Sequence, residues 1–590
     1  MSPARKKPGT EVKTTRPARG GTSWDTLAHP SYNIWGTGNV EEVLPGISRP
    51  LPCDISAAFM YLYAKGLLDI ANAHDLVDLA ELPRGNVFGF FGGRWAVNIA
   101  WLGAYAAVYS PDQESDWLTQ FVRGDEEATK SGVADNVERA RRTRRVVERT
   151  WERSVERADK ERVVAARARR AMLRRNLSRD SEAQLLGRVD KNVDLTARIF
   201  IRHSQSSIGG GEYVAQLGGF LDKELPGHPE EWTTTLTSAL QGVLSAEPIR
   251  EIWKLSRLAR RLRTVAADFR ADDVSTLAAK LSDPPTKQWE EFAAAYGKFI
   301  DEWGFRGQKE TDPSVPDWRE DPSFVLGALK ADVDLPARKD PSKREERAAM
   351  AREKLEKKII TQLPRRRRAE FRKLLKDSQV LVKARELTKA NWAETCRAFR
   401  PPLLELGTRF AERGLIAERD DIFFLRLDEV REAVAGDLGS RAAKGRITSR
   451  KAEYEALHEY GIPVTFSLPI ELERVKHART KRSVTLHGMG VSPGVAKGKA
   501  RIIMNAEAGD AAHIEPGEIL VAPYTDAPWT PLFWPAAGVV VERGGMLSHA
   551  STVAREFGIP AVVAVPQATE KIKQGTMVTV DGNTGTVKVG

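Results

Sequence analysis

The chain has 590 residues, of which 41% are hydrophobic, so it can form two or more domains with buried cores. Its 91 lysine and arginine residues outnumber the 80 acidic residues, and the net charge is +11. The two cysteines, Cys53 and Cys396, have no paired spacing, and no apolar run has the length of a membrane span or the character of a signal segment. The composition therefore excludes a disulfide framework and predicts a reduced, cytoplasmic protein.

Much of the positive charge is local. Residues 1–31 are basic and rich in Pro, Gly and Thr in their first part, and we expect a disordered tail there. Arginines also crowd residues 137–177, where apolar residues recur at helical spacing, and they fill positions 365–368 after Pro364, at the start of another expected helix. No recognised nucleic-acid module accompanies these clusters, so they favour solvated faces or docking surfaces for an acidic partner. We predict no nucleic-acid partner and no membrane partner.

Residues 32–477 are expected to form a large, mostly α-helical substrate domain. Within it, the Gly-, Ala- and Arg-rich stretch Ala435–Arg446 predicts a loop, and a helix is expected from Ser449 to Tyr460. Polar, basic residues near Lys476–Lys481 indicate a hinge, which we place at residues 478–484. Arg94 follows two glycines in this region and is a candidate site residue. The aromatic residues near it either line an apolar pocket or belong to the core: Phe88, Phe90, Phe91, Trp95 and Trp101.

Residues 485–590 have the pattern of an α/β domain. Residues 538–542 are β-branched and short, like a buried strand, and Ser548–Phe557 predicts a helix that is closed by Gly558. A Gly544–Gly545 turn joins the two, and it places His549 on the first turn of the helix. The sequence therefore predicts strand, turn, helix and strand around a single histidine.

This position suits a phosphoryl group on the histidine. Helix N-terminal amides lack partners and carry about half a positive charge, and glycines allow close backbone approach, so Gly544, Gly545 and Ser548 are expected to support a phosphate. Imidazole is a nucleophile at neutral pH, and a phosphorylated ring nitrogen can divide one transfer into two. From spacing alone, a helix-capping histidine in an ordinary α/β turn is an equally good interpretation.

Five blocks of sequence add a family resemblance. They resemble, in order, the swivelling phosphohistidine domain of the phosphoenolpyruvate-utilising enzymes, a family that includes rifampicin phosphotransferase: Gly490–Gly498, Ile519–Val521, Thr525–Pro531, Gly544–Val563 and Val580–Gly585. The resemblance implies that His549 carries a phosphoryl group between two sites and that Thr525 helps to support it. Dikinases and synthases of the family have a regulatory threonine two residues before this histidine. That position is Leu547 here, so control by its phosphorylation is not expected.

The helical region resembles the acceptor-substrate domain of rifampicin phosphotransferase and its relatives. The resemblance rests on blocks at Asn39–Leu51, Trp303–Pro322 and Arg385–Glu429. Arg385 and Lys389 are four residues apart on one helix face, where two cations repel unless an anion lies between them. A transferring phosphoryl group is such an anion, and the family resemblance places both residues beside the acceptor hydroxyl.

Two alternatives stay open for these residues. Arg385 and Lys389 could instead form surface pairs with Glu386 and other nearby acids. Arg306 and Glu310 are either a further pair in the substrate site or a structural ion pair that braces the Gly304 and Gly307 turn.

We expect the phosphoryl donor to lie on another polypeptide. The sequence contains no ATP-grasp domain, no phosphoenolpyruvate-binding barrel and no Walker-type loop. This arrangement resembles phenylphosphate synthase, in which a histidine-bearing subunit works with a separate ATP-grasp subunit. We therefore expect ATP and Mg²⁺ on the partner, no permanently bound cofactor or metal on this chain, and a small apolar, phenolic hydroxyl compound as acceptor. The alternatives are an antibiotic acceptor of the rifampicin type, a phosphocarrier or regulatory protein without its own acceptor, and a nucleic-acid-binding role.

Overall fold

The fold is taken from a computed structural model, which describes residues 34–37, 44, 46–73, 87–99, 160, 162–168, 170–171, 176–229, 231–240, 242–463, 465–468, 470, 472–474, 484–504, 514–526, 529–545 and 548–590. The predicted tail at residues 1–31, most of the arginine-rich stretch 137–177 and hinge residues 478–483 lie outside this set, as do Trp101 and Leu547. In the part that is described, no helix is both long and apolar enough to cross a membrane.

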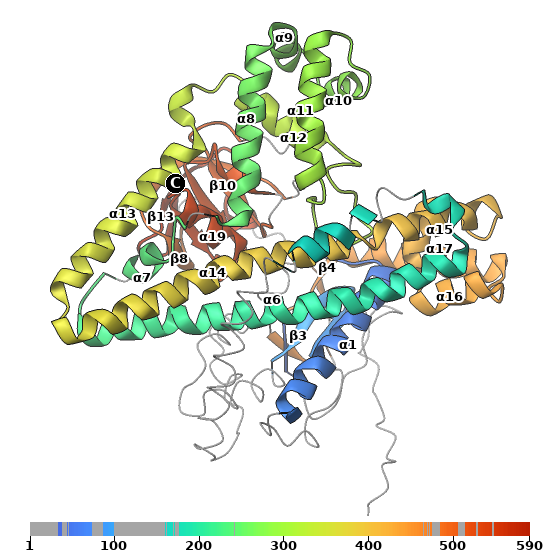
Figure 1. The fold of residues 1–590 in the computed structure, drawn as a ribbon, viewed down its shortest axis with the longest axis horizontal. Coiled ribbons are helices and arrows are strands. Elements are labelled where there is room, and N and C mark those ends of the chain that lie inside the picture. The colour runs from blue at the N-terminus through green and yellow to red at the C-terminus, as the bar shows by residue number, and fades with distance from the viewer. Residues whose placement is uncertain are drawn as a thin grey trace, which may run out of the picture.

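Two long helices form the spine of the molecule. Helix α6 (Glu182–Glu224) begins with a capping box, in which the Ser181 side chain accepts from the backbone of Gln184 and the Gln184 side chain accepts in return. Helix α14 (Arg368–Arg397) follows Pro364 and a short 3₁₀ turn, as the sequence predicts. The two helices lie side by side and run in opposite directions (Figure 1). Leucine and phenylalanine side chains, among them Leu217 and Phe371, share one buried cluster at their interface.

A small sheet and α1 (Pro50–Ala73) lie against this spine. The sheet has the strand order β2–β3–β1–β5, with strands β1 (Ile34–Gly36), β2 (Phe88–Phe91), β3 (Arg94–Asn98) and β5 (Thr465–Ser467). Its aromatic residues pack on one another: the Trp35 and Phe91 ring centroids are 4.7 Å apart, and those of Phe90 and Trp95 are 4.9 Å apart. Phe90, Phe91 and Trp95 are thus core residues and Phe88 packs against them, so the core interpretation of the aromatic run holds where the structure describes it.

The predicted loop at Ala435–Arg446 is wrong for most of its length. Helix α16 (Leu427–Ala435) ends at Gly436, whose φ of 87° lies in the left-handed region that favours glycine. Helix α17 (Ser440–Ala456) already begins four residues later, with Ala443 and Ile447 buried. Only residues 436–439 form the loop, because the alanines and arginines after it are good helix formers. The helix also ends before Tyr460, which begins strand β4 (Tyr460–Gly461).

The remaining helices form an arm beside the C-terminal region and an end of the spine. They are α7 (Glu231–Leu236), α8 (Glu247–Arg261), α9 (Arg263–Ala271), α10 (Val274–Ser282), α11 (Lys287–Trp303), α12 (Ser323–Asp332), α13 (Pro341–Gln362) and α15 (Arg400–Glu412). Aromatic side chains of α9 and α11 fill the arm, as in the stacked pair Phe269 and Trp289. A short strand, β6 (Glu473–Arg474), pairs with β4.

The described C-terminal strands form one eight-stranded sheet, in the order β7–β14–β13–β9–β10–β11–β12–β8. Their bounds are β7 (Val484–His487), β8 (Met489–Ser492), β9 (Val495–Ile502), β10 (Ile519–Ala522), β11 (Gly538–Val541), β12 (Ala561–Val563), β13 (Met577–Asp581) and β14 (Thr586–Val589). The four strands β9 to β12 run parallel, and the outer strands are antiparallel. The predicted fold class is confirmed at this level: a mostly helical chain with an α/β sheet at its C-terminal end.

The α/β region packs directly on the helical region. Figure 1 shows the sheet enclosed by α8, α13 and α14. Ala246 and Ile249, at the start of α8, belong to the same buried cluster as Trp529 and Phe533 of the α/β region. The Trp253 and Trp534 rings meet edge to face across this contact. The loops at the ends of the parallel strands therefore face the helices of the spine and arm.

Candidate functional site

His549 is the first residue of helix α19 (His549–Glu556), which follows β11 after a tight turn. The Ser548 side chain caps the helix by accepting from the backbone N–H of Ser551, and the carbonyl of Gly545 accepts from Ser548 N–H at 3.0 Å. Gly544 has a φ of 140°, which a residue with a side chain rarely adopts. The strand, turn and helix predicted here are confirmed. These three residues shape the turn, and their contact with a phosphate stays a prediction.

The His549 imidazole is buried, with 1% of its surface exposed. Its Nε2 lies 3.2 Å from the hydroxyl of Thr530, in the short helix α18 (Thr530–Phe533), and its ring stands edge-on to Phe533. Burial holds its pKa well below the ordinary value, and the positive charges of Lys389, Arg306 and Arg385 lower that pKa further. The ring is therefore neutral at pH 7, which is the nucleophilic form of imidazole.

Arg385 and Lys389 reach the histidine from α14. Both are almost fully buried, which contradicts the alternative that they form surface pairs. Arg385 Nη1 lies 2.5 Å from Glu386 Oε1, so this arginine has a carboxylate partner within the protein. The structure thus brings both cations close enough to act on His549, although more than 150 residues separate them in sequence. Their role in phosphoryl transfer stays a prediction.

The segment at residues 304–312 supplies the third cation. Arg306 Nη1 and Glu310 Oε2 form a buried ion pair of 2.7 Å. The backbone N–H of Lys309 in the same segment donates to Asp526 Oδ2 at 3.1 Å, across the contact between the two regions. The two interpretations of this pair are therefore compatible: Arg306 and Glu310 brace the segment, and the charge of Arg306 also acts on His549.

Thr525 and Asp526 follow β10, whose parallel neighbour β11 leads to His549. The carboxyl ends of adjacent parallel strands meet at one sheet edge, so the two loops lie together there. Burial and the nearby carboxylate of Glu310 raise the pKa of Asp526 to about 8. We did not select Asp526 from the sequence, although its place next to Thr525 after a buried strand was a usable signal.

Helix α19 ends with two buried ionisable residues, Arg555 and Glu556, that we did not select from the sequence. Burial lowers the pKa of Arg555 to about 10 and raises that of Glu556 to about 8. Glu556 Oε1 accepts from the backbone N–H of Leu240 at 3.3 Å, so this carboxyl ties α19 to the helical region. Nothing in the local sequence pattern indicated this contact.

Arg94 is placed elsewhere, in the small sheet. Its guanidinium donates to the carbonyls of Gly92, Leu457 and Tyr460, and it thereby joins β3 to the end of α17. The structure does not place Arg94 among the charged groups that act on His549. No group of three or more His, Cys, Asp or Glu side chains among the described residues could hold a metal ion.

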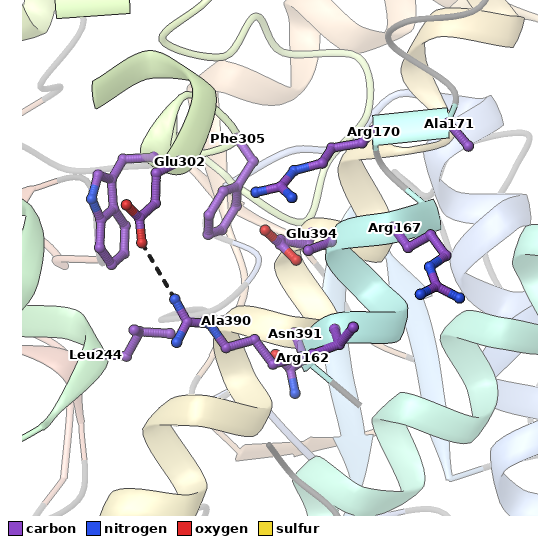
Figure 2. Close-up of a pocket in the computed structure, with 13 residues that line it drawn as sticks. Arg162, Arg167, Arg170, Ala171, Leu244, Glu302, Phe305, Ala390, Asn391 and Glu394 are labelled. Atoms are coloured by element: carbon purple, nitrogen blue, oxygen red, sulfur yellow. Dashed lines mark hydrogen bonds and ion pairs between the residues drawn. The ribbon is translucent and has the colours of Figure 1, made fainter. Parts of the chain in front are cut away.

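A cavity of about 660 Å³ opens beside α14. Figure 2 shows Phe305, Glu394 and Arg170 directed toward its centre. Ala390 and Phe305 line it and are sequence neighbours of Lys389 and Arg306, although neither of these cations lines the cavity itself. Arg162 and Glu302 face each other at 3.4 Å on its rim. The cavity combines an apolar wall with cations of the 162–171 segment.

The fold and the site define a class: a helical region joined to an α/β domain that presents a buried histidine at a helix N-terminus. Residues 514–585 match the mobile domain of the PEP-utilising enzymes, and residues 203–386 match the fourth domain of rifampicin phosphotransferase. The chain therefore contains a region that matches the mobile domain of the PEP-utilising enzymes, and it is similar to rifampicin phosphotransferase over about half of its length.

Three curated relatives illustrate the range of the similarity. The chain is 28% identical over 370 residues to the prodigiosin-synthesizing transferase PigC of Serratia marcescens, covering 62% of this chain and 41% of that protein. It is 29% identical over 299 residues to rifampicin phosphotransferase of Bacillus subtilis, with coverages of 49% and 34%. An uncharacterized phosphotransferase of Bacillus subtilis is 30% identical over 361 residues, with coverages of 58% and 42%. The chain thus spans between about a third and two fifths of the length of these relatives.

Proposed function

We propose that the chain is a phosphotransferase that carries a phosphoryl group on His549 and passes it to a hydroxyl of an organic acceptor. The observation that carries this proposal is the neutral, buried His549 at the start of α19, on which the charges of Lys389, Arg306 and Arg385 converge. Arg306 and Arg385 each pair with one carboxylate, yet the positive charges of all three cations still lower the pKa of the ring. A phosphoryl group, with a charge of about −1.5 to −2 at pH 7, is an anion that these positive charges would stabilise.

The chemistry follows from this arrangement. The neutral imidazole attacks the phosphorus of a donor, and the nitrogen–phosphorus bond forms as the donor's leaving group departs. In the second step an acceptor oxygen attacks the same phosphorus, and the electron pair of the nitrogen–phosphorus bond returns to the ring. Lys389 and Arg385 neutralise the charge on the transferring oxygens, which is the main contribution a protein makes to phosphoryl transfer.

The acceptor is best sought among large hydroxyl compounds. The relatives named as rifampicin phosphotransferases favour the antibiotic-type acceptor over the phenolic one that the resemblance to phenylphosphate synthase implied. The cavity of about 660 Å³ that Ala390 and Phe305 line has the volume expected for a drug-sized molecule. We therefore put a rifamycin-like hydroxyl first and a phenol second.

We also propose the source of the phosphoryl group. We expect ATP and Mg²⁺ on an ATP-grasp unit that phosphorylates His549, and a movement of the α/β domain about a hinge near residues 478–484 to bring the histidine from the donor to the acceptor. A phosphocarrier without its own small-molecule acceptor is the second candidate function, since the charged site around His549 would serve it as well.

The test combines the protein with a candidate ATP-grasp partner, Mg²⁺ and ATP labelled separately at the β and γ phosphates. We expect an acid-labile label on the wild type and none on the His549→Ala variant. A rifamycin panel and a phenol panel then receive the labelled protein, and transfer to a rifamycin hydroxyl supports the first acceptor. A label that reaches no organic acceptor supports the phosphocarrier, and the same labelling of His549→Ala would contradict the role of His549.

A further inference from the structure

Two buried carboxyl groups from distant parts of the chain, Asp526 and Glu310, lie close enough to act on each other. Asp526 lies in the loop after β10, and Glu310 lies in the segment between α11 and α12. Each is 2% exposed, and the backbone contact of Lys309 with Asp526 joins their two segments. One oxygen of each is bonded: Asp526 Oδ2 to Lys309 N–H, and Glu310 Oε2 to Arg306. The other two oxygens, Asp526 Oδ1 and Glu310 Oε1, are buried without a hydrogen-bond partner.

Unbonded carboxylate oxygens are costly inside a protein. A buried acceptor that has lost water and gained no partner costs about 1–3 kcal/mol, and more when it is charged. Such groups persist where they serve a ligand or a reaction step. The hydroxyl of Thr525, next to Asp526, is also buried without a partner. Asp526 Oδ1, Glu310 Oε1 and the Thr525 hydroxyl are therefore able to hydrogen-bond a bound molecule.

The surrounding charges define the state of the Asp526 carboxyl. Burial is the largest influence and raises its pKa, and the Glu310 carboxylate raises that pKa further. Lys389, the Lys309 N–H and Arg397 act in the opposite direction, and the resulting pKa is about 8. A carboxylate with such a pKa is a stronger base than an ordinary aspartate, and a base is most effective when its pKa lies near the working pH.

The same groups connect the carboxyl pair to the histidine. Lys389 acts on both Asp526 and His549, and Arg306 is bonded to Glu310 and acts on His549. Thr530, four residues after Asp526, has its hydroxyl 3.2 Å from His549 Nε2. The carboxyl pair and the imidazole thus share Lys389 and Arg306 as charged neighbours.

We propose that Asp526, supported by Glu310, is the base that accepts the proton of the attacking hydroxyl. The inference rests on the proposed function of His549. In the step, the acceptor oxygen forms a bond to phosphorus, the nitrogen–phosphorus bond breaks, and its electron pair returns to the imidazole. The hydroxyl proton passes to Asp526 Oδ1. The proton then passes from Asp526 to water when the domain next opens, and the carboxylate is restored.

A magnesium ion is the other occupant that two carboxylates suggest. Mg²⁺ takes oxygen ligands, and proteins often bind it through only one or two carboxylates. The positive charges of Lys389, Arg306 and Arg397 around this pair oppose a further cation and favour a proton. Stoichiometric Mg²⁺ binding that Asp526→Asn abolishes would overturn the proposal.

The experiment isolates the second half-reaction and needs no partner protein. Phosphoramidate, a small-molecule donor, phosphorylates the wild type and the variants Asp526→Asn, Glu310→Gln and Asp437→Asn. Asp437 is an exposed carboxyl between α16 and α17 and serves as the matched control. After removal of the donor, loss of the phosphoryl group from His549 is followed from pH 6 to pH 9. Water is the acceptor in every sample, and 4-nitrophenol and phenol are added in parallel. Discharge from urea-unfolded protein gives the background.

The wild-type rate is expected to rise with pH and to level off above about 8. Asp526→Asn should lose this rise and slow discharge by about 10²-fold, within the usual range for a general base. Glu310→Gln should keep the rise with its midpoint moved to lower pH, because the neighbouring negative charge is gone. Asp437→Asn should match the wild type. With phenols as acceptors, the rate of phosphoryl transfer should fall less in Asp526→Asn for 4-nitrophenol, which is ionised, than for phenol, which must lose a proton.

Besides Mg²⁺ binding, two kinetic results would overturn the inference. One is an Asp526→Asn profile that matches the wild type after equal phosphorylation, which leaves the carrier role of His549 intact. The other is a uniform slowing of Asp526→Asn at every pH with the rise preserved, which indicates a structural role for Asp526. Failure of the wild type to accept a phosphoryl group on His549 would instead refute the proposed function, and the inference with it.

Discussion

At the scale of single residues, the imidazole of His549 is controlled by cations that belong to another part of the fold. Burial alone favours the neutral ring, and Lys389 is the largest of the three positive charges that lower its pKa further. The same charge that keeps the empty ring neutral also favours an anion attached to it. Removal of Lys389 should therefore have two linked effects.

In the variant Lys389→Met, the pKa of His549 should move upward toward its ordinary value, which an NMR titration of the histidine ring would measure. Transfer of the phosphoryl group should slow by about 10²–10³-fold, the usual cost of removing one preorganised group that stabilises transition-state charge. Lys376→Met removes an exposed lysine from the same helix and should leave both quantities unchanged. An unchanged titration of His549 in Lys389→Met would show that this charge does not act on the ring.

The sequence predicted much of this site at the residue level. His549 was evident from its turn and helix, and Arg385, Lys389 and Arg306 from their charge and the family resemblance. Asp526 and Glu556 were missed because their partners, Lys309 and Leu240, lie 217 and 316 residues away. Arg94 was selected for its glycine neighbours, yet its guanidinium satisfies main-chain carbonyls instead.

At the scale of elements, the segment at residues 304–312 positions Arg306 and Glu310 against the α/β domain. Gly307 lets this segment pass close to its neighbour: an added Cβ would lie 2.9 Å from both Asp317 Cα and Pro316 O. The Arg397 side chain fixes the segment by donating to Gln308 O at 2.9 Å. The position of both site residues thus depends on a glycine that tolerates no side chain.

The variant Gly307→Ala should lose about 1–3 kcal/mol of stability, the usual cost of overpacking, because backbone atoms must move apart. Chemical denaturation would measure this loss, and phosphoryl transfer should slow as Arg306 shifts. Gly297→Ala is the matched control, since its added Cβ, in the middle of α11, has no neighbour within 4 Å. That change should be neutral or stabilising by up to about 1 kcal/mol. Equal stabilities of the two variants would contradict the close approach at Gly307.

Elements with clear boundaries were predicted well, and those that depend on context were not. The strand, glycine turn and helix around His549 follow from local pattern, and so does the helix after Pro364. The loop predicted at Ala435–Arg446 failed because Gly436 and Gly439 mark the two ends of a four-residue connection, whereas Gly445 lies inside α17. Only two residues of α17, Ala443 and Ile447, are buried, so its apolar pattern is weak.

At the scale of the whole molecule, the α/β domain is held against the helical region by buried polar groups as well as by apolar packing. Glu556 is the clearest case, since its carboxyl is 2% exposed and bonded to the Leu240 backbone. Its pKa of about 8 in the folded protein lies well above that of an exposed glutamate. The folded state therefore keeps this carboxyl protonated at neutral pH, whereas the unfolded state ionises it.

This difference makes the interface sensitive to pH in a defined direction. Between about pH 4.5 and pH 8, the unfolded state releases a proton that the folded state retains, so Glu556 lowers stability as the pH rises. Glu556→Gln keeps an oxygen for Leu240 and cannot ionise. Its free energy of unfolding should equal that of the wild type near pH 4 and exceed it near pH 8 by about 1–3 kcal/mol. Exposed Glu412→Gln should show no such divergence. A constant difference between Glu556→Gln and the wild type at both pH values would contradict the raised pKa.

The order of regions along the chain could be predicted from the sequence, because a helical pattern gives way to an α/β pattern near residue 484. The face on which the α/β domain docks could not. It depends on contacts such as that of Trp253 with Trp534. Each of these residues could equally be a core residue of its own region, so the sequence does not pair them. Docking of the α/β domain on the helical region is what brings the cations of α14 close enough to act on His549.

The central claim is that this docked His549 is the residue that holds the phosphoryl group, and site mapping after treatment with phosphoramidate tests it most directly. Intact mass and peptide mapping at alkaline pH should find one acid-labile phosphoryl group, on His549 of the wild type and absent from His549→Ala. Phosphorylation of a different residue, or equal phosphorylation of His549→Ala, would contradict the claim and leave the cations of Lys389, Arg306 and Arg385 without their proposed anion.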